Sequence, residues 1–279
     1  MKPTRRQFLF GTGATGLAAA AAGLYTWRIE PHWLEIVRRP LPVRGLPAAL
    51  AGKTLAQISD IHVGPRVDDD YVVRVFSRVA ALRPDIVVLT GDLVSHHDDT
   101  FEQMERVYRH FPRGRMATVG IPGNHDYGAA WSHPEIADRV VAIAREIGIT
   151  MLRNEIYELE GLQIVGLDDL WAKRFEPLLA FARFDDRQPA IALSHNPDTV
   201  DLPVWQGFEG WILSGHTHGG QCKAPFLPPP LLPVRNRLYT RGEFSLTGNR
   251  RLYINRGVGH LLPVRFNVRP EVTLFELVS

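Results

Sequence analysis

From residue 54 onward, short apolar runs alternate with longer amphipathic segments. Four apolar runs in the first half of this region predict strands, at 55–58, 86–89, 116–121 and 162–167. Three amphipathic segments predict helices, at 68–83, 100–111 and 132–147. The run Ile-Val-Val-Leu at 86–89 has no polar position, which is typical of a strand buried on both faces. Strands that alternate with helices in this way predict an α/β fold with a mostly parallel sheet.

The second half of the chain is richer in strand signals. Further short strands are predicted at 190–193, 211–213, 252–254 and 272–277. A second sheet packed alongside the first accounts for them. Residues 225–233 are apolar, proline-rich and uncharged, so we expect an exposed or partly docked loop there.

Residues 1–27 have the pattern of a targeting segment. The order Thr4-Arg5-Arg6-Gln7-Phe8-Leu9 resembles a twin-arginine export signal and is followed by a mildly apolar run. The alternatives are an ordinary secretion signal, or an uncleaved membrane anchor. We therefore expect export through the twin-arginine machinery to the periplasm or to the outer face of the cytoplasmic membrane. Residues 28–53 are expected to be a connector or an entry strand, and residues 54–279 the main domain.

Composition narrows the classes of function. The chain is 45% hydrophobic and 22% charged, which is typical of a globular protein and unlike a disordered chain. The single Cys222 excludes an intramolecular disulfide and a cysteine-based metal cage, and a small buried side chain is expected there. Lys2, Arg5 and Arg6 lie in a leader without acidic residues, so the rest of the chain has a net charge of −1. That balance argues against nucleic acid as a specific partner.

Polar clusters follow five of the predicted strands, each at its carboxyl end. They are Asp60 with His62, Asp92, then Asn124 with His125 and Asp126, then His195, and finally His216 with His218. Ligands of open α/β sheets bind beyond the carboxyl ends of the strands, so these side chains can converge. Asp60 and His62, like His216 and His218, are two residues apart, and on extended backbone such a pair would face the same side.

The residue types point to a metal centre. Aspartate, asparagine and histidine without thiolate suit Mn, Fe, Zn or Co better than Ca or Mg. Seven ligands exceed what one ion needs, so two divalent ions that share one bridging carboxylate fit better, as in many phosphoester-cleaving sites. Glycines before Asp92, Asn124 and His216 allow the close backbone approach that such a site requires.

The ordered clusters resemble the calcineurin-like metallophosphoesterases. The segments 193–198, 215–221 and 263–266 are similar to the bacterial YaeI/YkuE-type phosphodiesterases within that family. The resemblance implies a four-layer αββα sandwich of two mixed sheets. It assigns one ion to Asp60, His62 and His218, the other to Asn124, His195 and His216, and the bridge to Asp92. His125 would act at the phosphate or the leaving oxygen and be oriented by Asp126. Ser95 replaces an acidic residue that many relatives carry in the outer shell.

The sequence therefore predicts an exported dimetal phosphohydrolase, most of all a phosphodiesterase, in which a hydroxide held between the ions attacks phosphorus in line. Possible substrates include lipid-linked and nucleotide-sugar phosphoesters, among them UDP-2,3-diacylglucosamine-type pyrophosphates, and contact with a membrane is conceivable. One rival is a DNA nuclease, against which the net charge of −1 after the leader argues. The other is a non-catalytic metal-binding envelope protein, against which the presence of both His125 and Asp126 argues. Three features are left open: Arg265 as a phosphate contact or a structural ion pair, His260 at the surface or the rim of the site, and residues 96–99 at its border or in a solvated loop.

Overall fold

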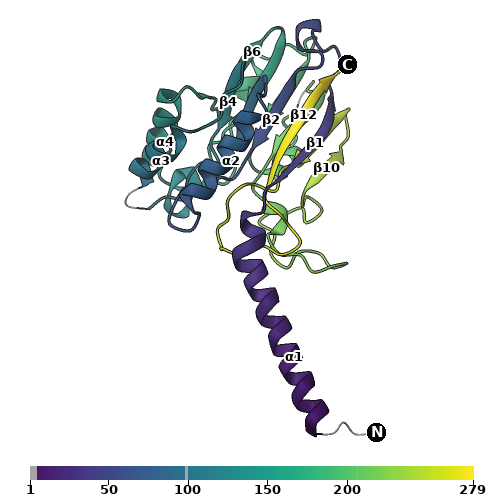
Figure 1. The fold of residues 1–279 in the computed structure, drawn as a ribbon. Helices are drawn as coiled ribbons and strands as arrows, with labels where there is room; N and C mark the ends of the chain where they lie inside the picture. Colours follow the sequence, from purple (N-terminus) through teal and green to yellow (C-terminus); the bar gives the residue numbers. More distant parts are fainter. Residues whose placement is uncertain (1–4, 98–99, 206) are drawn as a thin grey trace.

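The computed structural model describes residues 5–97, 100–205 and 207–279, and twelve strands form two six-stranded sheets (Figure 1). The first sheet has the order β1 (Glu35–Pro42), β12 (Glu271–Val278), β2 (Thr54–Ile58), β3 (Ile86–Thr90), β4 (Ala117–Ile121), β5 (Thr150–Met151). The second has the order β10 (Gly242–Ser245), β11 (Arg250–Ile254), β9 (Gly210–Ser214), β8 (Ala190–Leu193), β7 (Leu162–Gly166), β6 (Glu155–Leu159). Both sheets are mixed, because β12 is antiparallel to β2, and β6 and β10 are antiparallel to their neighbours.

Five α-helices accompany the sheets: α1 (Arg5–Leu24), α2 (Asp69–Ala81), α3 (Thr100–Tyr108), α4 (Pro134–Glu146) and α5 (Pro177–Phe181). A π-helical turn, Tyr25–Ile29, extends α1, and six short 3₁₀ turns occupy Glu30–His32, Ala48–Leu50, Asn124–Tyr127, Ala129–Trp131, Pro197–Asp201 and His218–Gly220. Helix α2 begins where the sequence predicts, because the Asp68 carboxylate accepts a hydrogen bond from the backbone N–H of Tyr71.

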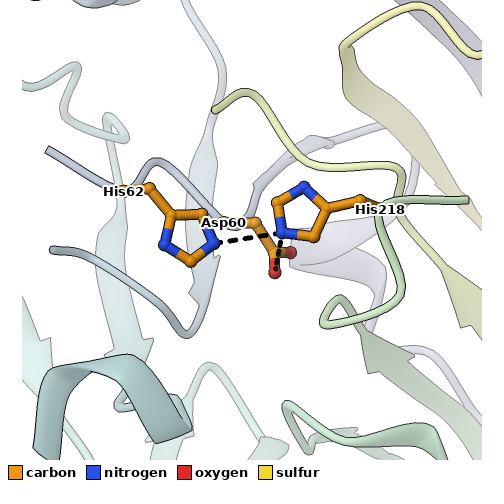
Figure 2. A group of neighbouring side chains, drawn as sticks. All are labelled: Asp60, His62 and His218. Atoms are coloured by element: carbon orange, nitrogen blue, oxygen red, sulfur yellow. Dashed lines mark hydrogen bonds and ion pairs between the residues drawn. The ribbon is translucent and has the colours of Figure 1, made fainter. Parts of the chain in front are cut away.

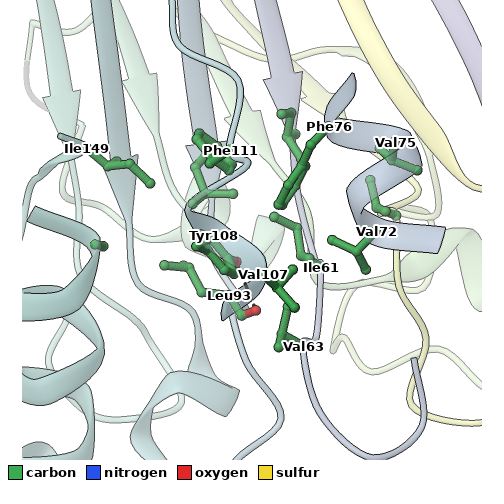
Figure 3. Close-up of a cluster of buried hydrophobic side chains, with 14 of the residues drawn as sticks. Ile61, Val63, Val72, Val75, Phe76, Leu93, Val107, Tyr108, Phe111 and Ile149 are labelled. Carbon is green, nitrogen blue, oxygen red and sulfur yellow. Dashed lines mark hydrogen bonds between the residues drawn. The ribbon is translucent and has the colours of Figure 1, made fainter. Parts of the chain in front are cut away.

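The two-residue period of the strands builds the layers. In β3, Val87 and Leu89 face α2 and α3, whereas Ile86 and Val88 face the second sheet. Figure 3 shows the first of these layers, where helical side chains such as Phe76 pack over the sheet. A third apolar layer covers the outer face of the second sheet, under the short α5 and the segment around Trp205. The predicted αββα sandwich is confirmed. Its fourth layer is thin, because the short α5 is the only α-helix described over the second sheet.

Residues 28–53 are more than a connector. Strand β1 lies in this segment and pairs in parallel with β12 over its whole length, from Glu35 opposite Glu271 to Pro42 opposite Val278. The expected entry strand is therefore the edge strand of the first sheet.

The carboxyl ends of the central strands of both sheets meet at one end of the molecule. The side chain of Gln57, near the end of β2, donates a hydrogen bond to the carbonyl of Ser214, the last residue of β9 (3.0 Å). We call this end the active edge. Because β12 is antiparallel to β2, its first residues also lie there.

Helix α1 projects from the body at the active edge (Figure 1). Its continuation is tied down by the backbone N–H of Arg265, which donates to the carbonyl of Thr26 (2.9 Å). No helix within the described ranges is both long enough and apolar enough to cross a membrane.

Candidate metal centre

The first group of ligands comprises Asp60, His62 and His218, which converge from two loops at the active edge (Figure 2). The Nε2 atoms of His62 and His218 lie 3.0 Å apart, and the Nε2 atom of His218 is 3.3 Å from Asp60 Oδ1. All three side chains are buried. Three donor atoms this close, from three separate side chains, form a site that one small cation can bind.

The second group comprises Asp92, His195 and His216. The Nε2 atom of His195 is 3.1 Å from Asp92 Oδ2 and 3.2 Å from His216 Nδ1. It is also 3.2 Å from Asn124 Oδ1, which adds the amide oxygen that the sequence predicts for this group. Asn124 Nδ2 is buried without a hydrogen-bond partner in the described part of the chain, so this side chain is oriented by its oxygen.

Asp92 stands between the two groups. Its Oδ2 atom is 3.1 Å from His195 Nε2 and 3.5 Å from His62 Nε2, and these two histidines belong to different groups. Its Oδ1 atom accepts a hydrogen bond from the backbone N–H of His125 (2.8 Å). One carboxylate oxygen thus faces both groups, which is the position that a bridging ligand needs.

The outer ring nitrogens fix the tautomers of the histidines. His195 Nδ1 donates to the carbonyl of Thr90 (2.8 Å), and His216 Nε2 donates to the carbonyl of Pro233 (2.8 Å). His62 Nδ1 lies 3.0 Å from the Ser95 hydroxyl. In His195 and His216 the bond to a carbonyl leaves the other ring nitrogen available to face the site, the arrangement of metal-binding histidines. Ser95 therefore occupies the outer-shell position that the sequence comparison assigns to an acidic residue.

The electrostatics of the protein groups alone are unfavourable. Burial raises the pKa of Asp60 to about 7 and lowers the pKa of His216 to about 3. Burial also lowers the pKa of His62 well below its usual range. For Asp92 burial is the largest single effect and raises the pKa, but the neighbouring His195, His125 and His62 together outweigh it, so that the pKa is well below its usual range. Divalent cations would relieve this desolvation and keep both carboxylates ionised.

The residues fit two metal ions. Imidazole nitrogens face each other in both groups, and two facing ring nitrogens share at most one proton, so a cation is their better partner. The donors are imidazole nitrogens and carboxylate or amide oxygens, a set that suits Mn, Fe, Zn or Co. Two groups joined by Asp92 match the paired ions of phosphoester-cleaving sites.

The local backbone differs from the sequence prediction. Asp60, His62, Asp92, His216 and His218 all have positive φ, between 50° and 69°. The expectation of same-side side chains on extended backbone is therefore wrong. Each of these residues adopts the left-handed conformation, which costs on the order of 1 kcal/mol and is typical of functional sites. The carboxyl-end loops hold the ligands by this turn geometry rather than by strand alternation.

All three glycines predicted to allow a close approach lie against the site, and a Cβ at Gly91 would collide with the ring of His195. A Cβ at Gly123 would collide with the backbone nitrogen and carboxylate of Asp92, and a Cβ at Gly215 would collide with Ser59 and the carboxylate of Asp60. Both positions therefore require glycine because a carboxylate ligand packs directly on the backbone.

His125 and Asp126 have different surroundings. The His125 ring is half-buried, and its centroid lies 5.0 Å from that of His62, so it borders the first group. The Asp126 carboxylate accepts hydrogen bonds from the backbone N–H groups of Gly123 (2.8 Å) and Val94 (3.0 Å). Contrary to the sequence expectation, Asp126 therefore holds the loop that carries His125 rather than the imidazole.

Arg265 and His260, whose roles the sequence left open, both have structural roles. Arg265 is fully buried and donates to the carbonyls of Gly259 (2.6 Å), Arg256 (3.0 Å) and Val268 (3.2 Å), so it is neither a phosphate contact nor half of an ion pair. His260 is buried, contrary to both expectations, and its ring donates to the carbonyl of Arg66 (2.9 Å).

The structure also bears on the predictions for Cys222 and for residues 96–99. Cys222 is half-buried rather than fully buried. His97 lies 2.7 Å from the amide oxygen of Gln103 in α3, which attaches it to that helix, whereas residues 98–99 lie outside the described ranges.

Sequence reasoning missed an aromatic wall beside the metal ligands. The ring of Trp171 lies edge-on to His216 (4.4 Å between centroids) and packs against Trp131 (4.6 Å), which in turn lies 6.3 Å from His125. Both tryptophans line a cleft of about 740 Å³, and Arg235 lines it as well. Trp131 follows the Asn124 cluster within seven residues, a proximity that offered a signal.

Asp169 was missed as well, although it follows β7 in the same way that the recognised clusters follow their strands. Its side chain is buried and its Oδ2 atom has no hydrogen-bond partner in the described part of the chain. Burial raises its pKa to about 6.

The pattern of the calcineurin-like phosphoesterase family matches residues 53–220, the region that supplies every ligand described above. The chain belongs to the calcineurin-like phosphoesterase family. It is therefore a metal-dependent phosphohydrolase, which confirms the interpretation of the sequence.

Three relatives align with nearly the whole chain. The metallophosphoesterase YkuE of Bacillus subtilis is 32% identical over 301 residues, covering 100% of this chain and 99% of that protein. The phosphodiesterase YaeI of Escherichia coli is 31% identical, covering 99% of each. The UDP-2,3-diacylglucosamine pyrophosphatase LpxG of Chlamydia trachomatis is 30% identical, covering 95% of this chain and 96% of that protein.

Proposed function

We propose that the protein is an exported phosphodiesterase that cleaves phosphodiester or pyrophosphate bonds of lipid-linked or nucleotide-sugar substrates. The observation that carries this proposal is the position of Asp92 between two groups of ligands, with His125 half-exposed beside them. Two divalent ions held there would neutralise the phosphoryl oxygens and supply a nucleophile from water at neutral pH.

The side chains of this protein contribute binding and proton transfer. Asp60 and Asp92 offset two of the four charges of the ions, so the site keeps a surplus of positive charge that attracts an anionic phosphoester. The His125 ring borders the first group without belonging to either group, which supports a role as the acid that protonates the leaving oxygen. The bonds from Gly123 and Val94 to Asp126 hold the loop in this position.

The names of the relatives support the choice of substrate class. YaeI is named a phosphodiesterase and LpxG a UDP-2,3-diacylglucosamine pyrophosphatase, so both names describe substrates in which a phosphate or pyrophosphate group joins two organic substituents. In this chain, the cleft lined by Trp131 and Trp171 offers an apolar wall next to the ligand His216 for one of those substituents.

Export is the second part of the proposal. The pair Arg5-Arg6 followed by Phe8-Leu9 supports delivery through the twin-arginine machinery, which moves folded proteins and so permits metal loading beforehand. The expected destination is the periplasm or the outer face of the cytoplasmic membrane.

The decisive assay compares esters and metals. Purified protein is depleted of metal, reloaded with Mn, Fe, Zn or Co, and assayed with bis(p-nitrophenyl) phosphate and p-nitrophenyl phosphate. We expect higher kcat/KM for the diester and loss of activity in Asp92→Asn. Asp85→Asn is the matched control, because Asp85 is also buried but accepts its bonds from Thr54 and Arg115 at the other end of the strands. Preference for the monoester, or full activity without metal, would overturn the proposal.

A further inference from the structure

Exposed apolar side chains are concentrated at the active edge. Of the twelve large hydrophobic side chains exposed in the described part of the chain, ten lie in residues 17–33, 226–238 and 262. The side chain of Phe226 is fully exposed, and Leu231 and Leu238 are 72% and 75% exposed. Single exposed leucines are common on soluble proteins, but a cluster of this kind marks an interaction surface.

Three segments form this surface, and hydrogen bonds join them. We call them the helix foot (residues 24–33), the proline loop (residues 222–241) and the tail loop (residues 260–269). The tail loop binds the foot through Arg265 N–H to Thr26 O (2.9 Å), and it binds the proline loop through Lys223 N–H to Phe266 O (2.9 Å). Figure 1 shows these loops at the end of the body from which α1 projects.

The charge of the surface has one sign. The proline loop contains Lys223, Arg235, Arg237 and Arg241 and no acidic residue. The tail loop adds Arg269 and the helix foot adds Arg28, because Arg265 and Glu30 of these segments are buried. The chain after the leader has a net charge of −1 as a whole, so this excess of positive charge is local. Apolar side chains ringed by cations match an anionic lipid bilayer, in which the apolar groups enter the interface and the cations meet the headgroups.

The surface is continuous with the metal centre. The carbonyl of Pro233 in the proline loop accepts the hydrogen bond from His216 Nε2 (2.8 Å), and the buried Leu232 precedes it. The same loop therefore has an exposed apolar end and an end that orients a metal ligand. A bilayer that contacted Phe226 would lie on the same side of the molecule as the ligands.

From these observations we propose that the proline loop, the tail loop and the helix foot dock on an anionic bilayer and hold the metal centre at headgroup depth, where a lipid-linked phosphoester is within reach. The proposal rests on the proposed phosphodiesterase function for its substrate, but the docking is a binding property that can be measured without catalysis.

Binding of the full chain to sedimenting vesicles tests the docking. Vesicles of phosphatidylglycerol mixed with phosphatidylcholine should bind the protein, and phosphatidylcholine vesicles should bind it much more weakly. Lys223→Gln with Arg237→Gln should lower the affinity about 30-fold, because each cation near an anionic surface contributes a factor of about five. Phe226→Gln with Leu227→Gln should lower it at least tenfold, roughly the effect of withdrawing two partly inserted apolar side chains.

A matched control distinguishes binding through this surface from nonspecific binding through any exposed leucine. Leu178 and Leu179 of α5 are 63% and 57% exposed, on the outer side of the second sheet. Leu178→Gln with Leu179→Gln should leave vesicle binding unchanged. An equal loss of vesicle binding in the Leu178/Leu179 variant and in the proline-loop variants would overturn the proposal. So would unchanged vesicle binding in the proline-loop variants.

A local probe excludes the possibility that α1 alone binds the vesicles. An environment-sensitive fluorophore on Phe226→Cys, in a Cys222→Ser background, should brighten with anionic vesicles and be quenched by nitroxide-labelled lipids. The same fluorophore on Leu178→Cys should do neither. A probe at 226 that stays in water, in a protein that still hydrolyses the soluble diester, refutes docking and leaves the function standing. A probe that inserts in a protein without hydrolytic activity refutes the function and leaves docking standing.

Discussion

Replacement of His125 by alanine separates a proton donor from a metal ligand. The ring of His125 lies beside the first group of ligands, but its structural hydrogen bond is made by the backbone N–H, which donates to Asp92 Oδ1 (2.8 Å). His125→Ala keeps that N–H, so both ions should remain bound. The ring itself is lost, and with it the proton for the leaving oxygen.

The size of the loss follows from general acid catalysis. A positioned acid contributes on the order of 10²–10⁴ in rate, equivalent to about 3–5 kcal/mol of transition-state stabilisation. An ester with a poor leaving group should show this full loss. A nitrophenyl ester, whose leaving group needs little protonation, should lose less than about tenfold.

The assay is kcat/KM of His125→Ala on diesters of graded leaving-group pKa, with metal content measured on the same samples. His133→Ala is the control, because His133 is an exposed histidine of the neighbouring segment that pairs with Glu135 (3.0 Å). A uniform loss together with missing metal would make His125 a ligand, and unchanged rates on every ester would remove it from catalysis.

Three further predictions test the outer shell, the core and the leader. Ser95→Ala removes the partner of His62 Nδ1 (3.0 Å) and should weaken metal affinity about 10–100-fold in chelator competition, and an unchanged affinity would contradict this role. Burial lowers the pKa of His260 to about 4, so the unfolded chain takes up its proton first as pH falls below about 6.5. The stability of the wild type relative to His260→Gln should therefore fall by about 2 kcal/mol between pH 7.5 and 5 in urea unfolding, whereas a constant difference would mean that His260 titrates normally. Arg5→Lys with Arg6→Lys should leave the protein in the cytoplasm on cell fractionation, and unchanged export would indicate the general secretion route.

The sequence by itself determined the central strands of both sheets, the helices over the first sheet and the candidate ligands, whereas it did not predict β5, β6, β10 or α5. The apolar run at 86–89 and the stripe through Phe76 encode a buried strand and the helix that covers it, because burial on a regular period is a local property of the chain. The polar residues that follow five strands identify the metal ligands for a related reason. Parallel strands place their carboxyl ends together, so Asp60 and His216 meet although 156 positions separate them.

The tertiary structure decided how those ligands are held and what surrounds them. Asp60 and His218 have left-handed backbone, which no local pattern predicts for a residue other than glycine and which persists only where the surrounding structure holds it. The terminal guanidinium nitrogens of Arg265 donate to the carbonyls of Arg256, Gly259 and Val268, which only the folded loops bring around one side chain. Strand β1 joins the sheet through pairing with β12, 236 positions away, and the bond from His216 to Pro233 puts the proline loop beside the metal centre. A hydrophobic period depends on residues that are close in the sequence, so the sequence reveals it. These contacts depend on how separate layers pack, and only the structure shows them.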